Sequence, residues 1–252
     1  MPPPLLVIAH RGDSAHRPEN TLAAIAGALE LGAVAVEIDV QLTRDGHVVV
    51  IHDPSLERTT NGQGDVRQMT LAEVRAVSAG YPSRFGDAFS GERVPTLVEA
   101  LALLRDRARV LVEIKAESVT ADATGGVEAL TAAEIRRAGM ADKVALISFD
   151  QRAIMRLRQL APEMTRGRIF ARTTADELLR DAAEAGCELV MPHKGQLADE
   201  LVARVRAAQL KLATWVVDEP EELRQLARFD LYGVGSNRPG VLLDAIEDGL
   251  LD

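Results

Sequence analysis

Short runs of apolar and β-branched residues alternate with longer amphipathic stretches along most of the chain. The runs have the length of strands, and the stretches repeat apolar residues every three or four positions, as helices do. This alternation predicts parallel strands joined by crossover helices. The nine expected strands are residues 5–9, 34–40, 48–52, 110–114, 144–149, 168–171, 189–192, 212–217 and 232–236. The expected helices are residues 22–31, 97–107, 127–138, 153–160, 175–185, 197–208, 221–227 and 239–248.

The second and third runs are too close together to be parallel neighbours. Only residues 41–47 separate them, whereas a parallel crossover needs about a dozen residues or more. Asp45 and Gly46 lie in the middle of this link, and Asp-Gly between alternating apolar residues favours a hairpin. The third run is therefore an antiparallel return arm. The other eight predict an α/β protein of the (β/α)8 type, a TIM barrel.

Residues 54–94 follow the hairpin without clear periodicity and contain Asn61-Gly62 and Pro82, which favour turns. We expect this segment to form an insertion that caps the C-terminal mouth of the barrel, within a single domain of residues 1–252. The hairpin is also expected to bring His52 roughly opposite Asp39 at that mouth.

Two of the expected barrel strands carry acidic residues on the face opposite their apolar residues. Glu37 and Asp39 lie in residues 34–40, and Glu113 lies in residues 110–114. Successive side chains of a strand point to opposite faces, so all three acids are expected to face the barrel axis. Carboxylates about 4 Å apart repel by about 4 kcal/mol at an effective dielectric near 20, so the trio predicts one divalent cation. A ligand set of oxygen alone favours Mg²⁺ or Ca²⁺. Taken alone, each acid is better explained by a structural ion pair.

Two histidines are expected at the same rim. His10 ends the first run and precedes Arg11 and Gly12, and His52 ends the hairpin. Imidazoles titrate near neutral pH, which suits general acid and base catalysis. Arg11 and Lys115 place positive charge beside the acids, which suits a phosphoryl group, although charge balance would also explain them.

Composition narrows the range of partners. The chain has 47% hydrophobic but only 3% aromatic residues, so Ala, Val, Leu and Ile must fill its core. A formal net charge of −9 argues against nucleic acid and against anionic membranes. A small anionic substrate would then need a local basic pocket.

Other features favour a cytoplasmic protein without stable membrane insertion. The first ten residues lack a basic start and a long apolar run, and no apolar stretch approaches the roughly 20 residues of a membrane span. Cys187 is the single cysteine, which excludes an intramolecular disulfide and is best explained as a core residue. Asn20 or Thr21 is explained as a helix cap.

Motifs spread over nearly the whole chain resemble those of the glycerophosphodiester phosphodiesterase family. They are His10-Arg11-Gly12, Pro18-Glu19-Asn20-Thr21, Glu37-Ile38-Asp39-Val40, Thr43-Arg44-Asp45-Gly46, His52-Asp53, Arg58-Thr59-Thr60-Asn61-Gly62, Val94-Pro95-Thr96-Leu97, Glu113-Ile114-Lys115, Ser148-Phe149-Asp150, Trp215 and Asn237-Arg238-Pro239.

The resemblance implies metal-dependent hydrolysis of glycerophosphocholine, glycerophosphoethanolamine or similar diesters to glycerol-3-phosphate and an alcohol. It implies that His10 and His52 are the acid and base, that Arg11 and Lys115 contact the phosphate, and that Glu37, Asp39 and Glu113 hold the metal. Which histidine is the base stays open, as does the nucleophile, which is either water or the substrate's own hydroxyl.

The chain departs from the family pattern at two places. The family often has Asn within the pair Val217-Asp218 and Asp within the pair Ser236-Asn237, and these departures bear on how the substrate is held. Trp215 either lines the substrate pocket or packs in the barrel.

Two other functions stay open. A phosphodiesterase of lysophospholipid or sphingomyelin type could use the same barrel, but the missing anchor disfavours it. A catalytically silent barrel that binds phosphodiesters or a protein is also compatible with the fold, but the intact set of acids and histidines disfavours it. The sequence does not predict the oligomeric state.

Overall fold

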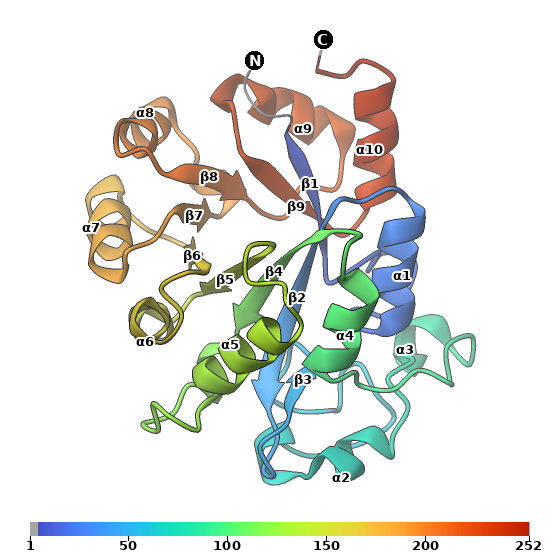
Figure 1. Ribbon diagram of the computed structural model, residues 1–252. Helices are drawn as coiled ribbons and strands as arrows, with labels where there is room; N and C mark the ends of the chain where they lie inside the picture. Colours follow the sequence, from blue (N-terminus) through green and yellow to red (C-terminus); the bar gives the residue numbers. More distant parts are fainter. Residues whose placement is uncertain (1–4, 252) are drawn as a thin grey trace.

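The computed structural model describes residues 5–251. Residues 1–4 and residue 252 lie outside the described part. The two ends of the predicted domain, and the first four of the ten N-terminal residues considered above, therefore lie outside it as well. Strands pair in parallel around a closed barrel in which the first pairs with both the second and the last (Figure 1). The barrel strands are β1 (Leu6–His10), β2 (Ala35–Leu42), β4 (Arg109–Ile114), β5 (Val144–Ser148), β6 (Thr165–Phe170), β7 (Leu189–Pro192), β8 (Lys211–Thr214) and β9 (Gly233–Ser236).

Helices surround the barrel (Figure 1). They are α1 (Leu22–Glu30), α4 (Leu97–Leu104), α5 (Val127–Arg137), α6 (Gln151–Leu160), α7 (Ala175–Ala185), α8 (Asp199–Ala207), α9 (Pro220–Leu226) and α10 (Pro239–Glu247). Thr96 and Thr174 begin α4 and α7 with a capping box, in which side chain and backbone satisfy each other's free groups. The predicted (β/α)8 barrel is confirmed, with element ends that differ from the predicted ones by at most three residues.

Alternation along the strands divides the core into two layers. Val36, Ile38 and Val40 of β2 pack outward in the layer shared with the helices. The inner layer contains Ile8 of β1 and Leu111 of β4. Each fully buried side chain of this size contributes about 1.5–3 kcal/mol. The acids of β2 and β4 lie beyond the inner layer, toward the C-terminal ends of the strands.

The hairpin forms at Asp45-Gly46 as predicted. β3 (Val48–Val50) runs antiparallel to β2, with Val50 opposite Val40. The Ile51 N–H donates to the Asp39 carbonyl at 3.0 Å, so the residue opposite Asp39 is Ile51. His52 follows directly, so it lies within one residue of the approximate position predicted for it.

Residues 54–94 form an insertion at the C-terminal end of the barrel (Figure 1). It contains the 3-10 helix η1 (Val66–Gln68) and the helices α2 (Leu71–Arg75) and α3 (Pro82–Phe85). Each is too short to show periodicity in sequence. The insertion shares a small apolar core with the hairpin, made by Val49, Ile51, Leu56, Val66, Val74, Ala79 and Val94. No helix within residues 5–251 combines the length and hydropathy that crossing a membrane would require.

Candidate active site

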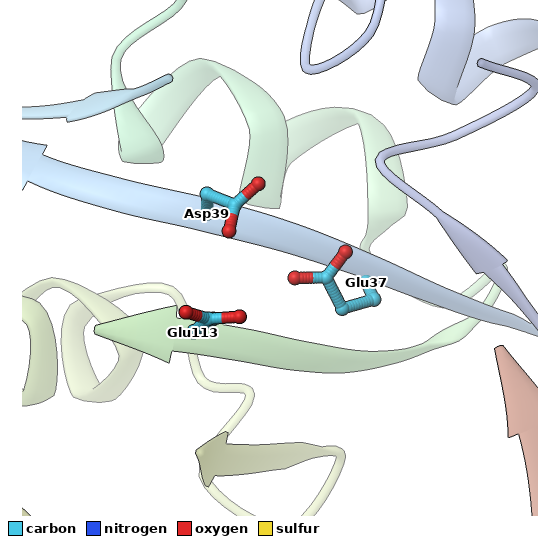
Figure 2. A group of neighbouring side chains, drawn as sticks. All are labelled: Glu37, Asp39 and Glu113. Carbon is cyan, nitrogen blue, oxygen red and sulfur yellow. The ribbon is translucent and has the colours of Figure 1, made fainter. Parts of the chain in front are cut away.

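Three buried carboxylates converge at the C-terminal mouth of the barrel, where TIM-barrel enzymes carry their active sites (Figure 2). Glu37 and Asp39 come from β2, and Glu113 comes from β4, where it lies opposite Asp39. One oxygen of each lies within 4.8 Å of the others. Glu37 Oε1 and Asp39 Oδ1 are buried without a hydrogen-bond partner. An all-oxygen cluster with such free oxygens fits a hard divalent cation.

Crowding changes the proton affinity of the cluster. Burial and the charge of Asp39 raise the pKa of Glu37 well above its ordinary value and the pKa of Glu113 to about 7. Burial acts in the same direction on Asp39, but Arg11 and Lys115 outweigh it and hold its pKa below the ordinary range. The two glutamates therefore bind protons more readily than ordinary carboxylates do, and a divalent cation would compete with protons for them.

The two basic residues predicted at the site, Arg11 and Lys115, contact the carboxylates directly. Arg11 Nε lies 3.0 Å from Asp39 Oδ2, and its Nη1 donates to Glu19 Oε1 at 2.8 Å. Lys115 Nζ donates to Glu113 Oε1 at 2.7 Å and lies 3.3 Å from Asp39 Oδ1. The positive charges of Arg11 and Lys115 therefore lie directly beside the proposed metal ligands.

A sharp turn after β1 positions Arg11. Arg11 has φ 59° and Gly12 has φ 83°, a left-handed region that suits glycine. A Cβ on Gly12 would lie 2.5 Å from the carbonyl carbon of Ala24, so only glycine fits against α1. The turn directs the Arg11 N–H to Glu37 Oε2, 3.1 Å away.

Both predicted catalytic histidines line the cavity, and their partners differ. His10 Nδ1 lies 2.7 Å from Asn237 Oδ1, and its Nε2 lies 4.0 Å from Glu37 Oε2. Burial, followed by the charge of Arg11, lowers the pKa of His10 to about 4, so its ring is neutral at pH 7. His52 Nδ1 lies 2.6 Å from Asp53 Oδ1.

Several supporting residues could not be assigned from sequence. Thr21 is the N-cap of α1, as one of the two predicted candidates, but Asn20 hydrogen-bonds Asp39 instead. Arg58 of the insertion donates to both oxygens of Glu19 and to Asp53. Asn20 has φ 60°, a conformation that Asn tolerates better than most residues.

The site opens into a cavity of about 250 Å³ with two unlike walls. One wall carries the charged residues and histidines, and the other is apolar: Ile147, Phe149, Ile169, Met191 and Trp215. The Trp215 indole N–H donates to the Met191 carbonyl at 3.0 Å, and the Trp215 ring meets Phe149 edge to face. Trp215 therefore both packs in the barrel and lines the cavity, so the two readings of its role are compatible.

Fold and site together define the class of (β/α)8-barrel phosphodiesterases. The sequence model of the glycerophosphoryl diester phosphodiesterase family matches residues 10–241, and the chain belongs to this family. The predicted family and enzyme class are thereby confirmed.

Similar proteins cover almost the whole chain. A glycerophosphodiester phosphodiesterase of Caldanaerobacter subterraneus subsp. tengcongensis is 36% identical over 245 residues, which are 97% of this chain and 98% of the relative. A solved structure of an Oleispira antarctica phosphodiesterase, in complex with the product sn-glycerol-3-phosphate, has a TM-score of 0.85 and 29% identity, covering 98% of this chain and 97% of that one. A glycerophosphodiester phosphodiesterase structure from Agrobacterium tumefaciens has a TM-score of 0.82 and 30% identity, covering 96% and 100%.

Proposed function

We propose that this enzyme hydrolyses glycerophosphodiesters, such as glycerophosphocholine or glycerophosphoethanolamine, to glycerol-3-phosphate and an alcohol. The observation that carries the proposal is the buried cluster of Glu37, Asp39 and Glu113, in which one oxygen of Glu37 and one of Asp39 have no hydrogen-bond partner. The two glutamates of the cluster line the cavity. Family membership supports the reaction class. The product bound in the Oleispira antarctica structure supports a small phosphodiester as substrate.

The three carboxylates would hold one divalent cation, Mg²⁺ or Ca²⁺, which supplies positive charge to the phosphate when bound. Arg11 and Lys115 bind the non-ester phosphate oxygens, since both lie beside the cluster and both line the cavity. The apolar wall around Trp215 packs against the organic part of the substrate.

The two histidines divide the proton transfers. His10 accepts the proton of the nucleophile, since its ring is neutral at pH 7 and Nδ1 is engaged by Asn237, which leaves Nε2 for the cavity. His52 donates a proton to the leaving alcohol. The carboxylate of Asp53, 2.6 Å from its Nδ1, orients the ring for this role.

A cytoplasmic location is part of the same proposal. It rests on the soluble nature of the proposed substrates and on a single cysteine, Cys187, which is buried and free. The net charge of −9 disfavours nucleic acid as a partner.

Release of glycerol-3-phosphate from glycerophosphocholine tests the function. Purified protein is assayed with EDTA, Mg²⁺ or Ca²⁺, beside His10→Ala and a control, His16→Ala, whose side chain is 61% exposed. We expect metal-dependent release that is lost in His10→Ala and kept in His16→Ala. No release with either metal from any glycerophosphodiester would contradict the proposal, and faster turnover of lysophosphatidylcholine micelles would favour the lipid-cleaving alternative.

A further inference from the structure

Asp218 and Asn237, from the two pairs where the chain departs from the family pattern, hydrogen-bond each other, and Asn237 also contacts His10. They follow β8 and β9, neighbouring strands of the barrel. Asp218 Oδ1 accepts hydrogen bonds from the Asn237 N–H at 2.7 Å and from the Ser236 hydroxyl at 3.1 Å. Asp218 Oδ2 accepts from Asn237 Nδ2 at 2.9 Å. The carboxylate thus holds both the backbone and the side chain of Asn237.

These contacts fix which way the Asn237 amide points. An ionised carboxylate only accepts hydrogen bonds, so the NH₂ group of Asn237 must face Asp218. The amide oxygen then faces His10 Nδ1 at 2.7 Å. Because an amide oxygen cannot donate, Nδ1 of His10 must carry the hydrogen in the neutral ring. Its Nε2, on the side of Glu37 and the cavity, keeps a free lone pair.

We propose that Asp218 is a positioning residue that, acting through Asn237, selects the tautomer of His10 able to accept a proton at Nε2. A neutral imidazole otherwise has two tautomers, and the hydrogen bond at one nitrogen decides the state of the other. The inference rests on the proposed function, in which Nε2 accepts the proton of the nucleophile. Asp218 itself need not touch the substrate.

Asp218→Asn removes this selection. An amide at position 218 keeps its oxygen on the Asn237 N–H and presents its NH₂ to the Asn237 side chain. Asn237 then turns its own oxygen toward position 218 and its NH₂ toward His10. Nδ1 must now accept, the hydrogen moves to Nε2, and the ring loses its basic site in the cavity.

Exchanging the two residues restores the selection. In the double variant Asp218→Asn/Asn237→Asp, the NH₂ of residue 218 donates to one oxygen of residue 237, and the other oxygen of residue 237 accepts from His10 Nδ1. The hydrogen-bond acceptor returns to the place where the wild type has it, although the negative charge has moved.

Nitrogen NMR and kinetics together test the inference. Protein with ¹⁵N-labelled histidine, saturated with Ca²⁺, is recorded at pH 7.5, and the His10 signals are assigned by their loss in His10→Ala. Thermal unfolding checks each fold, and Asp230→Asn, an exposed site at the other end of the barrel, controls for the charge change. We expect hydrogen on Nδ1 in the wild type and the double variant, and on Nε2 in Asp218→Asn. We also expect kcat to fall about 10²-fold or more in Asp218→Asn with KM little changed, and to recover in the double variant.

Three results would overturn the inference. They are hydrogen on Nε2 in the wild type, a folded Asp218→Asn that keeps Nδ1–H and the wild-type kcat, and a folded double variant without recovery of Nδ1–H. The NMR result does not depend on turnover. A wild type that cleaves no glycerophosphodiester but shows Nδ1–H therefore contradicts the proposed function and leaves the tautomer selection intact.

Discussion

Asn20 and Asp39 exchange two hydrogen bonds at the barrel mouth. Asn20 Nδ2 donates to Asp39 Oδ2 at 2.8 Å, and the Asp39 N–H donates to Asn20 Oδ1 at 3.1 Å. Both residues are buried. Asn20 thereby orients Asp39, the most acidic ligand of the proposed metal site. Contacts that support a metal ligand in this way typically change the metal affinity about 10- to 100-fold.

We therefore predict that Asn20→Ala weakens Ca²⁺ binding by about tenfold or more, measured by titration calorimetry. Asn61→Ala is the matched control, because Asn61 also accepts a backbone hydrogen bond, from Ser78, but lies in the insertion away from the cluster. Equal affinities in Asn20→Ala and the wild type would show that Asn20 does not support the metal site.

The raised pKa of Glu113, about 7, predicts how pH and metal act on stability. A carboxyl group whose pKa is higher in the folded state stabilises the protein below its unfolded pKa, and this contribution is lost as pH rises through the folded value. The metal-free protein should therefore lose stability between about pH 4.5 and pH 7 through this group. A bound cation removes the repulsion, so Ca²⁺ should raise Tm more at pH 8 than at pH 5.5.

Glu113→Gln checks this assignment by thermal unfolding. Without the carboxyl group, the metal-free protein should show a flatter dependence of Tm on pH, and Ca²⁺ should raise Tm less at pH 8. A Ca²⁺-induced shift that is the same at both pH values in the wild type would contradict the raised pKa.

Two glycines with the same backbone conformation should differ in their tolerance of alanine. Gly12 and Gly46 have φ of 83° and 81°. A Cβ on Gly46 would meet nothing within 4 Å, whereas one on Gly12 would lie 2.5 Å from the backbone of Ala24. Gly46→Ala should cost only the strain of a left-handed residue, about 1 kcal/mol. Gly12→Ala should cost clearly more in urea unfolding and should displace Arg11. Equal losses would mean that the packing against α1 is not limiting.

The sequence was sufficient to predict the barrel and the three acids because both follow from local periodicity. Alternation along β2 and β4 put Glu37, Asp39 and Glu113 on the inner face, and the structure brings their oxygens together. The hairpin was predicted from Asp45-Gly46, and His52 was placed only roughly opposite Asp39; the structure puts it one residue further along the chain.

The supporting network was not predictable in this way. Asn20, Arg58 and Asp218 reach partners on other elements, and their roles depend on how loops pack rather than on spacing along the chain. The prediction that Asn20 or Thr21 caps the helix is confirmed by Thr21, but nothing in the sequence indicated that Asn20 would bind Asp39. Periodicity predicts which face a residue occupies and does not predict which side chain it meets.

Arg58 of the insertion contacts two carboxylates that hold residues of the site. Its Nη1 and Nη2 donate to the two oxygens of Glu19, which also holds Arg11, and its Nε and Nη2 donate to Asp53, the partner of His52. A lysine cannot make this forked set of contacts, because its ammonium is a single point charge. Arg58→Lys should therefore lower kcat/KM for glycerophosphocholine by about tenfold, with little change in Tm.

Arg75→Lys is the matched control, since Arg75 belongs to the same insertion, is similarly exposed and pairs with the single carboxylate of Glu99. It should leave kcat/KM unchanged. If both variants behaved alike, the fork of Arg58 would have no role beyond that of a surface ion pair. A loss confined to Arg58→Lys would instead mean that the insertion helps to orient Asp53 and Glu19, and through them His52 and Arg11.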